Sequence, residues 1–199
     1  MKKLLLSVVL LASPFALAST WDIDSAHASG NFSVRHMMVS NVKGTLGKVT
    51  GKVELDDADV TKSKVDVTID VKGINTKEQK RDDHLRSKDF FDVEKFPNIT
   101  FKSTKIEKAG DKLKVTGDLT IRGVTRPVTL DTAVTSEVKN PFTKAVTRGV
   151  TGTAKINRKD FGLTWNVALE AGGVLVGDEV EISVEAELIK QEAAAPAKK

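Results

Sequence analysis

The sequence predicts an all-β protein, folded as an eight-stranded antiparallel barrel with short helical segments over one end. Three observations carry this prediction. Most of the chain alternates apolar and polar residues with a period of two, as strands with one buried face do. The alternation is broken at length only once, over residues 81–103, where charges of both signs mix with phenylalanines. The 199 residues include no cysteine, so stability must come from burial.

The alternating segments recur at fairly regular intervals and are separated by turn-forming residues such as Gly110 and Pro141. Residues 21–24 form a short lead-in to the first of them. We expect eight strands, over residues 30–38, 44–56, 64–72, 98–106, 112–121, 128–138, 148–156 and 179–188.

Each expected strand is apolar on one face only. In residues 179–188, every second position from Val180 to Leu188 is apolar. Strands of this kind need one shared interior, which either a two-sheet sandwich or a closed up-and-down barrel provides. A closed barrel is favoured because closure removes edge strands without needing a cysteine or another cross-link between two sheets.

The long interruption carries the signals of short helices. Thr76 and Gln79 fit a capping box that opens a helix ending at Arg86. Ser87 fits the cap of a further short turn, which Pro97 would stop. We expect these segments to lie over one end of the barrel.

Several inward positions of the expected strands carry small residues, among them Gly47, Gly51, Gly117, Gly152 and Ala154. An eight-stranded barrel is either filled by side chains or holds one small ligand. Small inward residues favour a cavity, but glycines also bend strands for closure. Substitution by leucine at positions 117 and 152 distinguishes the two interpretations, since a cavity predicts loss of binding and a bend predicts loss of stability.

The first 18 residues are typical of a cleavable secretory signal peptide. Two lysines precede an apolar run over residues 4–11, and residues 16–18 match the A-x-A cleavage signature. The run is too short for a membrane anchor, which needs about 20 residues. We therefore expect a periplasmic protein without stable membrane insertion, with its barrel in residues 19–190. Residues 191–199 lack an apolar pattern and are expected to form a disordered tail.

Charge and composition argue against nucleic-acid binding. The formal net charge is +4 and becomes +2 when the two lysines of the signal peptide are removed. Basic and acidic residues are interspersed, and the chain contains no tyrosine. Nucleic-acid binding needs a concentrated basic face with stacking aromatics.

The sequence does not predict catalysis or metal binding. It has no nucleophile elbow and no glycine-rich phosphate loop. Asp82, Asp83 and His84 are the best acid and base candidates, but their spacing from Arg81 and Arg86 more simply makes an ion-pair network. The three histidines match no metal-ligand spacing. We therefore expect no enzyme, no metal and no cofactor.

Most of the aromatic residues flank the expected cap and the strands that it would cover. They can pack the cap onto the barrel, contributing about 2 kcal/mol each, or line the mouth of an apolar tunnel, and both can hold at once. The residues are Phe32, Phe90, Phe91, Phe96, Phe101, Phe161 and Trp165.

Five longer segments carry specific motifs. They are WDIDSAHASGNFSVRHMMVSNVKG at 21–44, RDDHLRSKDFFDVEKFPNITFKS at 81–103, GDLTIRGVTRPVTL at 117–130, INRKDFGLTW at 156–165 and VGDEVEISVEAEL at 176–188. In this order they resemble the YceI-like family of exported bacterial polyisoprenoid-binding proteins. The resemblance implies a lipocalin-like, extended barrel whose cavity holds a long isoprenoid or comparable lipid.

With this resemblance, we expect a periplasmic protein that binds a polyisoprenoid or an isoprenoid quinone and performs no chemistry. Burial contributes about 0.8 kcal/mol per methylene, so chain length should dominate affinity. The expected cavity wall comprises Phe32, Val34, Phe90, Phe91, Phe101, Leu119, Ile121, Phe161 and Trp165. The expected head-group residues at the rim are His27, His36, Arg81, Asp82, His84 and Arg86.

Two alternatives remain open from the sequence. One is a structural or stress-response periplasmic protein with a filled barrel and a protein partner. The other is an enzyme acting on a lipid or quinone, with Asp82, Asp83 or His84 as acid and base. The charged outer strand faces favour a monomer, with a homodimer through one barrel flank as the alternative.

Overall fold

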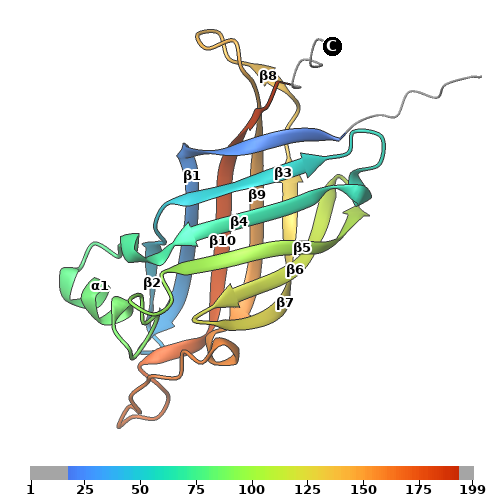
Figure 1. Ribbon diagram of the computed structural model, residues 1–199. Coiled ribbons are helices and arrows are strands. Elements are labelled where there is room, and N and C mark those ends of the chain that lie inside the picture. Colours follow the sequence, from blue (N-terminus) through green and yellow to red (C-terminus); the bar gives the residue numbers. More distant parts are fainter. Residues whose placement is uncertain (1–17, 193–199) are drawn as a thin grey trace, which may run out of the picture.

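The computed structural model describes residues 18–192, which form a closed antiparallel β-barrel (Figure 1). The predicted signal peptide and C-terminal tail lie almost wholly outside the described residues. Among residues 18–192, no helix is both long and apolar enough to cross a bilayer. The predicted fold class, an all-β antiparallel barrel of eight strands, is confirmed.

Eight strands close the barrel in the order β10-β1-β3-β4-β5-β6-β7-β9, and β9 pairs with β10 to complete the ring. Each strand pairs antiparallel with its neighbours, which leaves no open edge in the ring. Their bounds are β1 (Ser19–His36), β3 (Val49–Leu55), β4 (Lys64–Asp70), β5 (Asn98–Ala109), β6 (Lys112–Ile121), β7 (Val124–Val134), β9 (Val146–Asn157) and β10 (Val176–Lys190).

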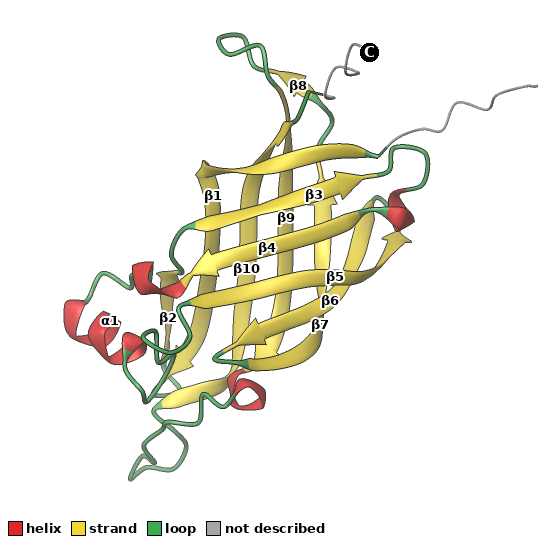
Figure 2. Ribbon diagram, in the orientation of Figure 1, coloured by secondary structure: helices red, strands yellow, loops and turns green. Residues whose placement is uncertain are grey.

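Shorter elements attach to this ring (Figure 2). Strand β2 (Ser40–Thr45) pairs with the second half of β1, and β8 (Val138–Lys139) pairs with β9. The helical segments are α1 (Gln79–Arg86) and the 3-10 turns η1 (Val60–Lys62), η2 (Val71–Gly73) and η3 (Arg158–Phe161).

Strand β1 is longer than expected and bends sharply (Figure 1). Its first residues, Ser19–Asp22, pair with β3, and its last, Asn31–His36, pair with β2. The register against β10 shifts between Ile23 and Ala28. A bulge of this kind lets one strand turn a barrel corner, so the expected lead-in and first strand are one element.

The segment expected as one strand over residues 44–56 is divided into β2 and β3. The break falls at Gly47, where an added Cβ would lie only 1.8 Å from the backbone oxygen of Asp70. Two backbones meet too closely there for any side chain. The single-strand prediction was therefore wrong for a tertiary reason that the alternation does not reveal.

Helix α1 ends at Arg86 as expected but begins with a different cap. The carboxylate of Glu78 accepts the Lys80 N–H, so Glu78 is the N-cap residue. Thr76 instead donates both its backbone N–H (2.8 Å) and its hydroxyl (2.5 Å) to Asp82 Oδ1. Ser87 closes α1 by donating to the His84 carbonyl, and the segment after it forms turns rather than a second helix.

The larger of two apolar clusters extends to the end of the barrel that α1 and the following turns cover. Phe90, Val93, Phe161 and Leu163 are buried there. The smaller cluster surrounds Trp21, which is fully buried at the opposite end. The space between these ends forms the candidate site.

Candidate ligand cavity

Three hollow spaces follow one another from the barrel interior to the surface. We call them the inner cavity (about 150 Å³), the neck cavity (about 90 Å³) and the mouth pocket (about 380 Å³). The inner and neck cavities share the walls Leu46, Ile99, Ile121 and Ile182. The neck cavity and the mouth pocket share Phe32, Val34, Leu85, Phe90 and Val176. The shared wall residues place the three spaces next to one another.

The inner cavity is lined almost entirely by aliphatic side chains from all eight strands of the ring, such as Val65, Val115 and Val184. An apolar cavity of about 150 Å³ lined in this way stays free of water and accepts an apolar guest. Its chemistry therefore suits hydrocarbon rather than a polar ligand.

The three spaces extend along a substantial length of barrel. Val176 of β10 lines the neck and mouth, whereas Leu188 of the same strand lines the inner cavity. At roughly 3.3 Å per residue, the strand between them covers about 40 Å. Joined together, the spaces would hold an elongated molecule.

The inward glycines divide into two kinds. An added Cβ at Gly152 would lie 3.6 Å from Thr132 Oγ1 and 3.9 Å from Leu130 Cβ, and Gly152 lines the inner cavity. An added Cβ at Gly117 would lie 2.4 Å from the Lys102 carbonyl oxygen, opposite a register shift in β5. Gly152 therefore leaves room for a ligand, while Gly117 permits a close approach of two strands.

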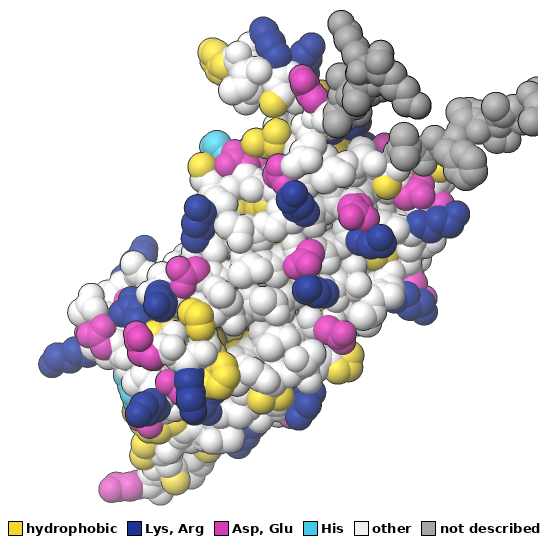
Figure 3. Space-filling view, viewed as in Figure 1, with side chains coloured by type: hydrophobic (Ala, Val, Ile, Leu, Met, Phe, Trp, Pro, Cys, Tyr) yellow, Lys and Arg dark blue, Asp and Glu magenta, His cyan; other side chains and the backbone are white. Residues whose placement is uncertain are grey.

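The mouth pocket combines an aromatic floor with a charged rim. Phe32, Phe90 and Trp165 line it, together with His36 and His84. The His84 ring stands edge-on to Phe90 (centroids 5.0 Å apart) and Trp165 (4.7 Å). In Figure 3, hydrophobic side chains emerge among charged ones at the end of the molecule that carries α1. This arrangement can hold an apolar chain beside a polar head.

Eight of the nine expected wall residues line these spaces. Phe101, Leu119 and Ile121 face the inner cavity, and the neck and mouth account for the others. Phe161 is the exception: it is 1% exposed, belongs to the packed core and lines none of the three spaces. Turn η3 directs its ring into that core, so its expected contact with ligand is corrected.

Three of the six expected head-group residues, His36, Arg81 and His84, lie at the mouth pocket. Asp82 and Arg86 do not, because both fasten α1 to the segment that precedes it, residues 72–76. Asp82 is 5% exposed and accepts from Thr76, while Arg86 donates to the carbonyls of Lys72 (2.9 Å) and Ile74 (2.8 Å). Their expected head-group role is therefore corrected to a structural one.

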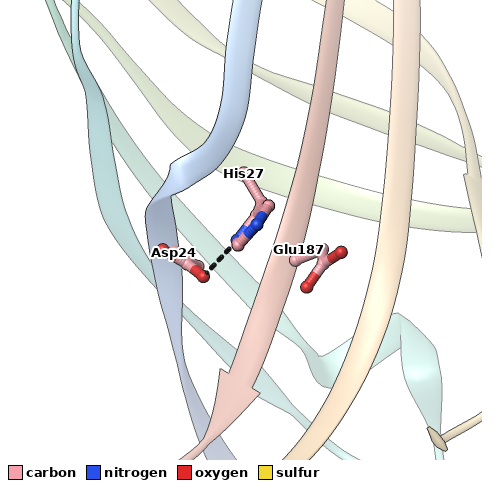
Figure 4. Close-up of side chains that lie close together, drawn as sticks. All are labelled: Asp24, His27 and Glu187. Carbon is pink, nitrogen blue, oxygen red and sulfur yellow. Dashed lines mark hydrogen bonds and ion pairs between the residues drawn. The ribbon is translucent and has the colours of Figure 1, made fainter. Parts of the chain in front are cut away.

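His27 lies on the outer wall, at the β1 bulge, and not at the mouth (Figure 4). Its side chain is 63% exposed, and Nδ1 lies 2.7 Å from Asp24 Oδ2. This hydrogen bond, together with the charges of Asp24 and Glu187, raises the pKa of His27. The same bond lowers the pKa of Asp24. We assign no ligand to this exposed group.

Sequence reasoning missed Arg158, which organises the segment beside the mouth. It is 3% exposed and donates to the carbonyls of Gly177 (2.9 Å), Trp165 (2.9 Å) and Leu163. Burial lowers the pKa of its guanidinium, which the nearby Asp178 partly offsets. An arginine that opens a short 3-10 turn gives no sequence signal of such burial.

Sequence reasoning also missed how the far end of the barrel closes. The Arg148 guanidinium and the Lys190 amine lie 5.2 and 5.3 Å from the Trp21 ring centroid. Both cations pair with Glu137, at 3.0 and 3.1 Å, and their hydrogen bonds lower its pKa. A signal was available, because Arg148 occupies an inward position of its strand.

These features define an antiparallel barrel with an enclosed apolar interior that opens toward a charged mouth. The chain belongs to the YceI-like family, whose domain model matches residues 21–188. The resemblance seen in the sequence motifs is thereby confirmed.

Similar proteins include UPF0312 protein SAS2572 of Staphylococcus aureus (strain MSSA476), which is 40% identical over 169 residues, covering 85% of this chain and 96% of the relative. The crystal structure of the Campylobacter jejuni YCEI protein is 33% identical (TM-score 0.65), covering 79% of this chain and 90% of that one. Burkholderia cenocepacia BcnA is 27% identical (TM-score 0.71), covering 83% and 98%. A polyisoprenoid binding domain from Saccharophagus degradans shares the fold at 14% identity (TM-score 0.61), covering 88% and 99%.

Proposed function

We propose that this protein binds a long apolar lipid inside its barrel, with the chain in the inner and neck cavities and the polar head in the mouth pocket. The observation that carries the proposal is the series of three adjoining spaces, each sharing wall residues with the next. A filled barrel would leave no inner cavity lined by all eight strands. The structural alternative is therefore less well supported.

A polyisoprenoid or an isoprenoid quinone is the ligand class that we propose. The apolar interior suits a hydrocarbon chain, whose burial contributes about 0.8 kcal/mol per methylene. The Saccharophagus degradans neighbour with the same fold is named for polyisoprenoid binding. The mouth offers Arg81, His36 and His84 to a carbonyl, hydroxyl or phosphate head.

We propose binding without catalysis. Of the acid and base candidates, Asp82 is engaged by Thr76 and Asp83 pairs with Arg86 at 3.0 Å. Neither lines the three spaces. His84, the third candidate, lines the mouth pocket, where its Nε2 lies 2.9 Å from Asp89 Oδ2 and no second candidate joins it. An enzyme would need such groups to converge on the bound ligand. The periplasm is the proposed location, on the strength of the signal peptide in the sequence.

The test is to extract protein purified from the periplasm with organic solvent and to identify what it carries by mass spectrometry. We expect an isoprenoid lipid in the native protein and uptake of added isoprenoid quinone by the emptied one. Affinity should rise with chain length for one head group. Absence of any co-purified lipid, together with no uptake, would contradict the proposal.

A further inference from the structure

The hairpin between β1 and β2 presents an apolar tip beside the mouth. Met37, Met38 and Val39 are 45%, 53% and 75% exposed. Both methionines have left-handed backbone angles (φ 49° and 61°), which non-glycine residues rarely adopt. The backbone holds them there, since Met37 N–H donates to Leu175 O (2.8 Å) and Val39 N–H to His36 O (3.1 Å). The turn thus fixes three apolar side chains toward solvent.

A second loop adds to this tip. Residues 166–175 lead into β10, and Val167 is 48% exposed. The loops touch, because a Cβ added at Gly173 would lie 3.2 Å from Met38 Cγ. Leu175 of the same loop lines the mouth pocket. We call Met37, Met38, Val39 and Val167 the apolar rim.

Cations beside the apolar rim lack acidic partners. Arg35, Lys80 and Arg81 line the mouth pocket together with one acidic residue, Glu78. Arg35 donates to Met38 O (3.0 Å) and Arg81 to Thr76 O (3.0 Å), and within residues 18–192 none of the three is paired with a carboxylate. On the barrel walls, by contrast, lysines form ion pairs with glutamates, as in Lys64–Glu54 (3.1 Å) and Lys155–Glu179 (2.9 Å).

We propose that the mouth end docks on the surface of an anionic lipid bilayer. The apolar rim would enter the interface between head groups and acyl chains, and Arg35, Lys80 and Arg81 would face lipid phosphates. Exposed apolar side chains flanked by unpaired cations fit such a surface. Docking in this orientation turns the mouth pocket toward the bilayer, so an apolar chain could pass between bilayer and barrel without crossing water.

The experiment is flotation of the full mature protein with phosphatidylcholine vesicles, with and without phosphatidylglycerol and free of isoprenoid. We expect binding to anionic vesicles that weakens as salt is raised. The double variant Met37→Asp/Met38→Asp should lower the partition coefficient by about tenfold or more, because charges are excluded from the interface. Replacing Arg35 or Lys80 by glutamine should lower it by about fivefold per cation.

The opposite end supplies a matched control. Phe142, in the loop between β8 and β9, is 90% exposed. That loop lies at the end of the barrel opposite α1 (Figure 1). Phe142→Asp should leave vesicle binding unchanged. Val167→Asp is a second rim variant, and the thermal midpoint of each variant reports folding.

Three outcomes would overturn the proposal: no binding to anionic vesicles, equal loss in Phe142→Asp and the methionine variant, or a methionine variant that only converts a dimer to a monomer. The inference does not depend on the cavity ligand. Protein that floats but takes up no isoprenoid contradicts the proposed function alone, and protein that takes up isoprenoid but does not float contradicts docking alone.

Discussion

Gly152 and Gly117 show how one residue type at equivalent inward positions serves different purposes. We expect Gly152→Leu to fill part of the inner cavity and to weaken binding of an isoprenoid quinone by about tenfold or more, since each displaced methylene costs about 0.8 kcal/mol. Stability should change little, because neighbouring atoms lie beyond 3.5 Å of the added Cβ. Thr151→Leu, on the exposed face of the same strand, is the control. Equal affinity in the two variants would place the ligand elsewhere.

Gly117→Leu should behave in the opposite way. Its Cβ would meet the Lys102 carbonyl at 2.4 Å, so strands β5 and β6 must move apart, at a cost of about 3 kcal/mol in the free energy of unfolding. Denaturant unfolding of this variant measures the loss. A variant as stable as the wild type, but unable to bind, would show that Gly117 borders the ligand.

The His27 side chain on the outer wall gives a pH-dependent prediction. Because the folded-state pKa is raised above its ordinary value of about 6.5, the contribution of protonated His27 to stability is fully present below pH 6.5. It is lost as pH rises through the folded-state pKa. NMR titration of the imidazole should give a midpoint above 6.5. The midpoint should fall more in Asp24→Asn than in Glu187→Gln, because the Asp24 hydrogen bond is the largest cause. A midpoint unchanged in Asp24→Asn would refute this.

At the scale of elements, buried Arg158 joins η3, the segment after it and the start of β10. Replacing it by methionine leaves the carbonyls of Gly177, Trp165 and Leu163 without their donor. Removal of a buried, charged donor of this kind costs about 3 kcal/mol or more. Calorimetry or denaturant unfolding of Arg158→Met should show this loss.

Lys159→Met is the matched control for Arg158→Met. The neighbouring lysine is 44% exposed and pairs with the same Asp178 at 2.8 Å, so its replacement should cost under about 1 kcal/mol. Similar losses in the two variants would mean that burial and the carbonyl contacts contribute little to stability.

The elements also show what the sequence could predict. The alternation of apolar and polar residues identified the ring strands, because a strand with one buried face carries an apolar side chain at every second position. The same alternation correctly placed Leu119 and Phe101 on the inner cavity. The break at Gly47 and the bend in β1 were not foreseeable, since they depend on contacts with strands distant in sequence. The head-group prediction was wrong for Asp82 and Arg86, because the way α1 packs on the segment before it decides whether a charged side chain faces the pocket or a hydrogen-bond partner in that segment.

For the whole molecule, the two ends of the barrel have different chemistry. One end is closed by the fully buried Trp21, between Arg148 and Lys190, with Glu137 pairing both cations. The other end is closed by aromatic and aliphatic side chains, and the same side chains line both the neck cavity and the mouth pocket. Apolar contacts rearrange without leaving a charge unpaired. For the proposed ligand, we therefore expect entry at the mouth.

This asymmetry predicts that blocking the mouth stops ligand uptake. The chain contains no cysteine, so one introduced thiol can be labelled selectively with a bulky maleimide. Lys80→Cys places it on the mouth pocket, and Ser136→Cys places it beside the closed end, next to Glu137. Labelling should slow uptake of isoprenoid quinone from detergent in the first variant, relative to its unlabelled form, and leave the second unaffected.

Stopped-flow quenching of tryptophan fluorescence measures the rate of uptake, since Trp165 lies in the mouth pocket. Slowing by the label at position 136 alone would mean that the ligand enters past Trp21.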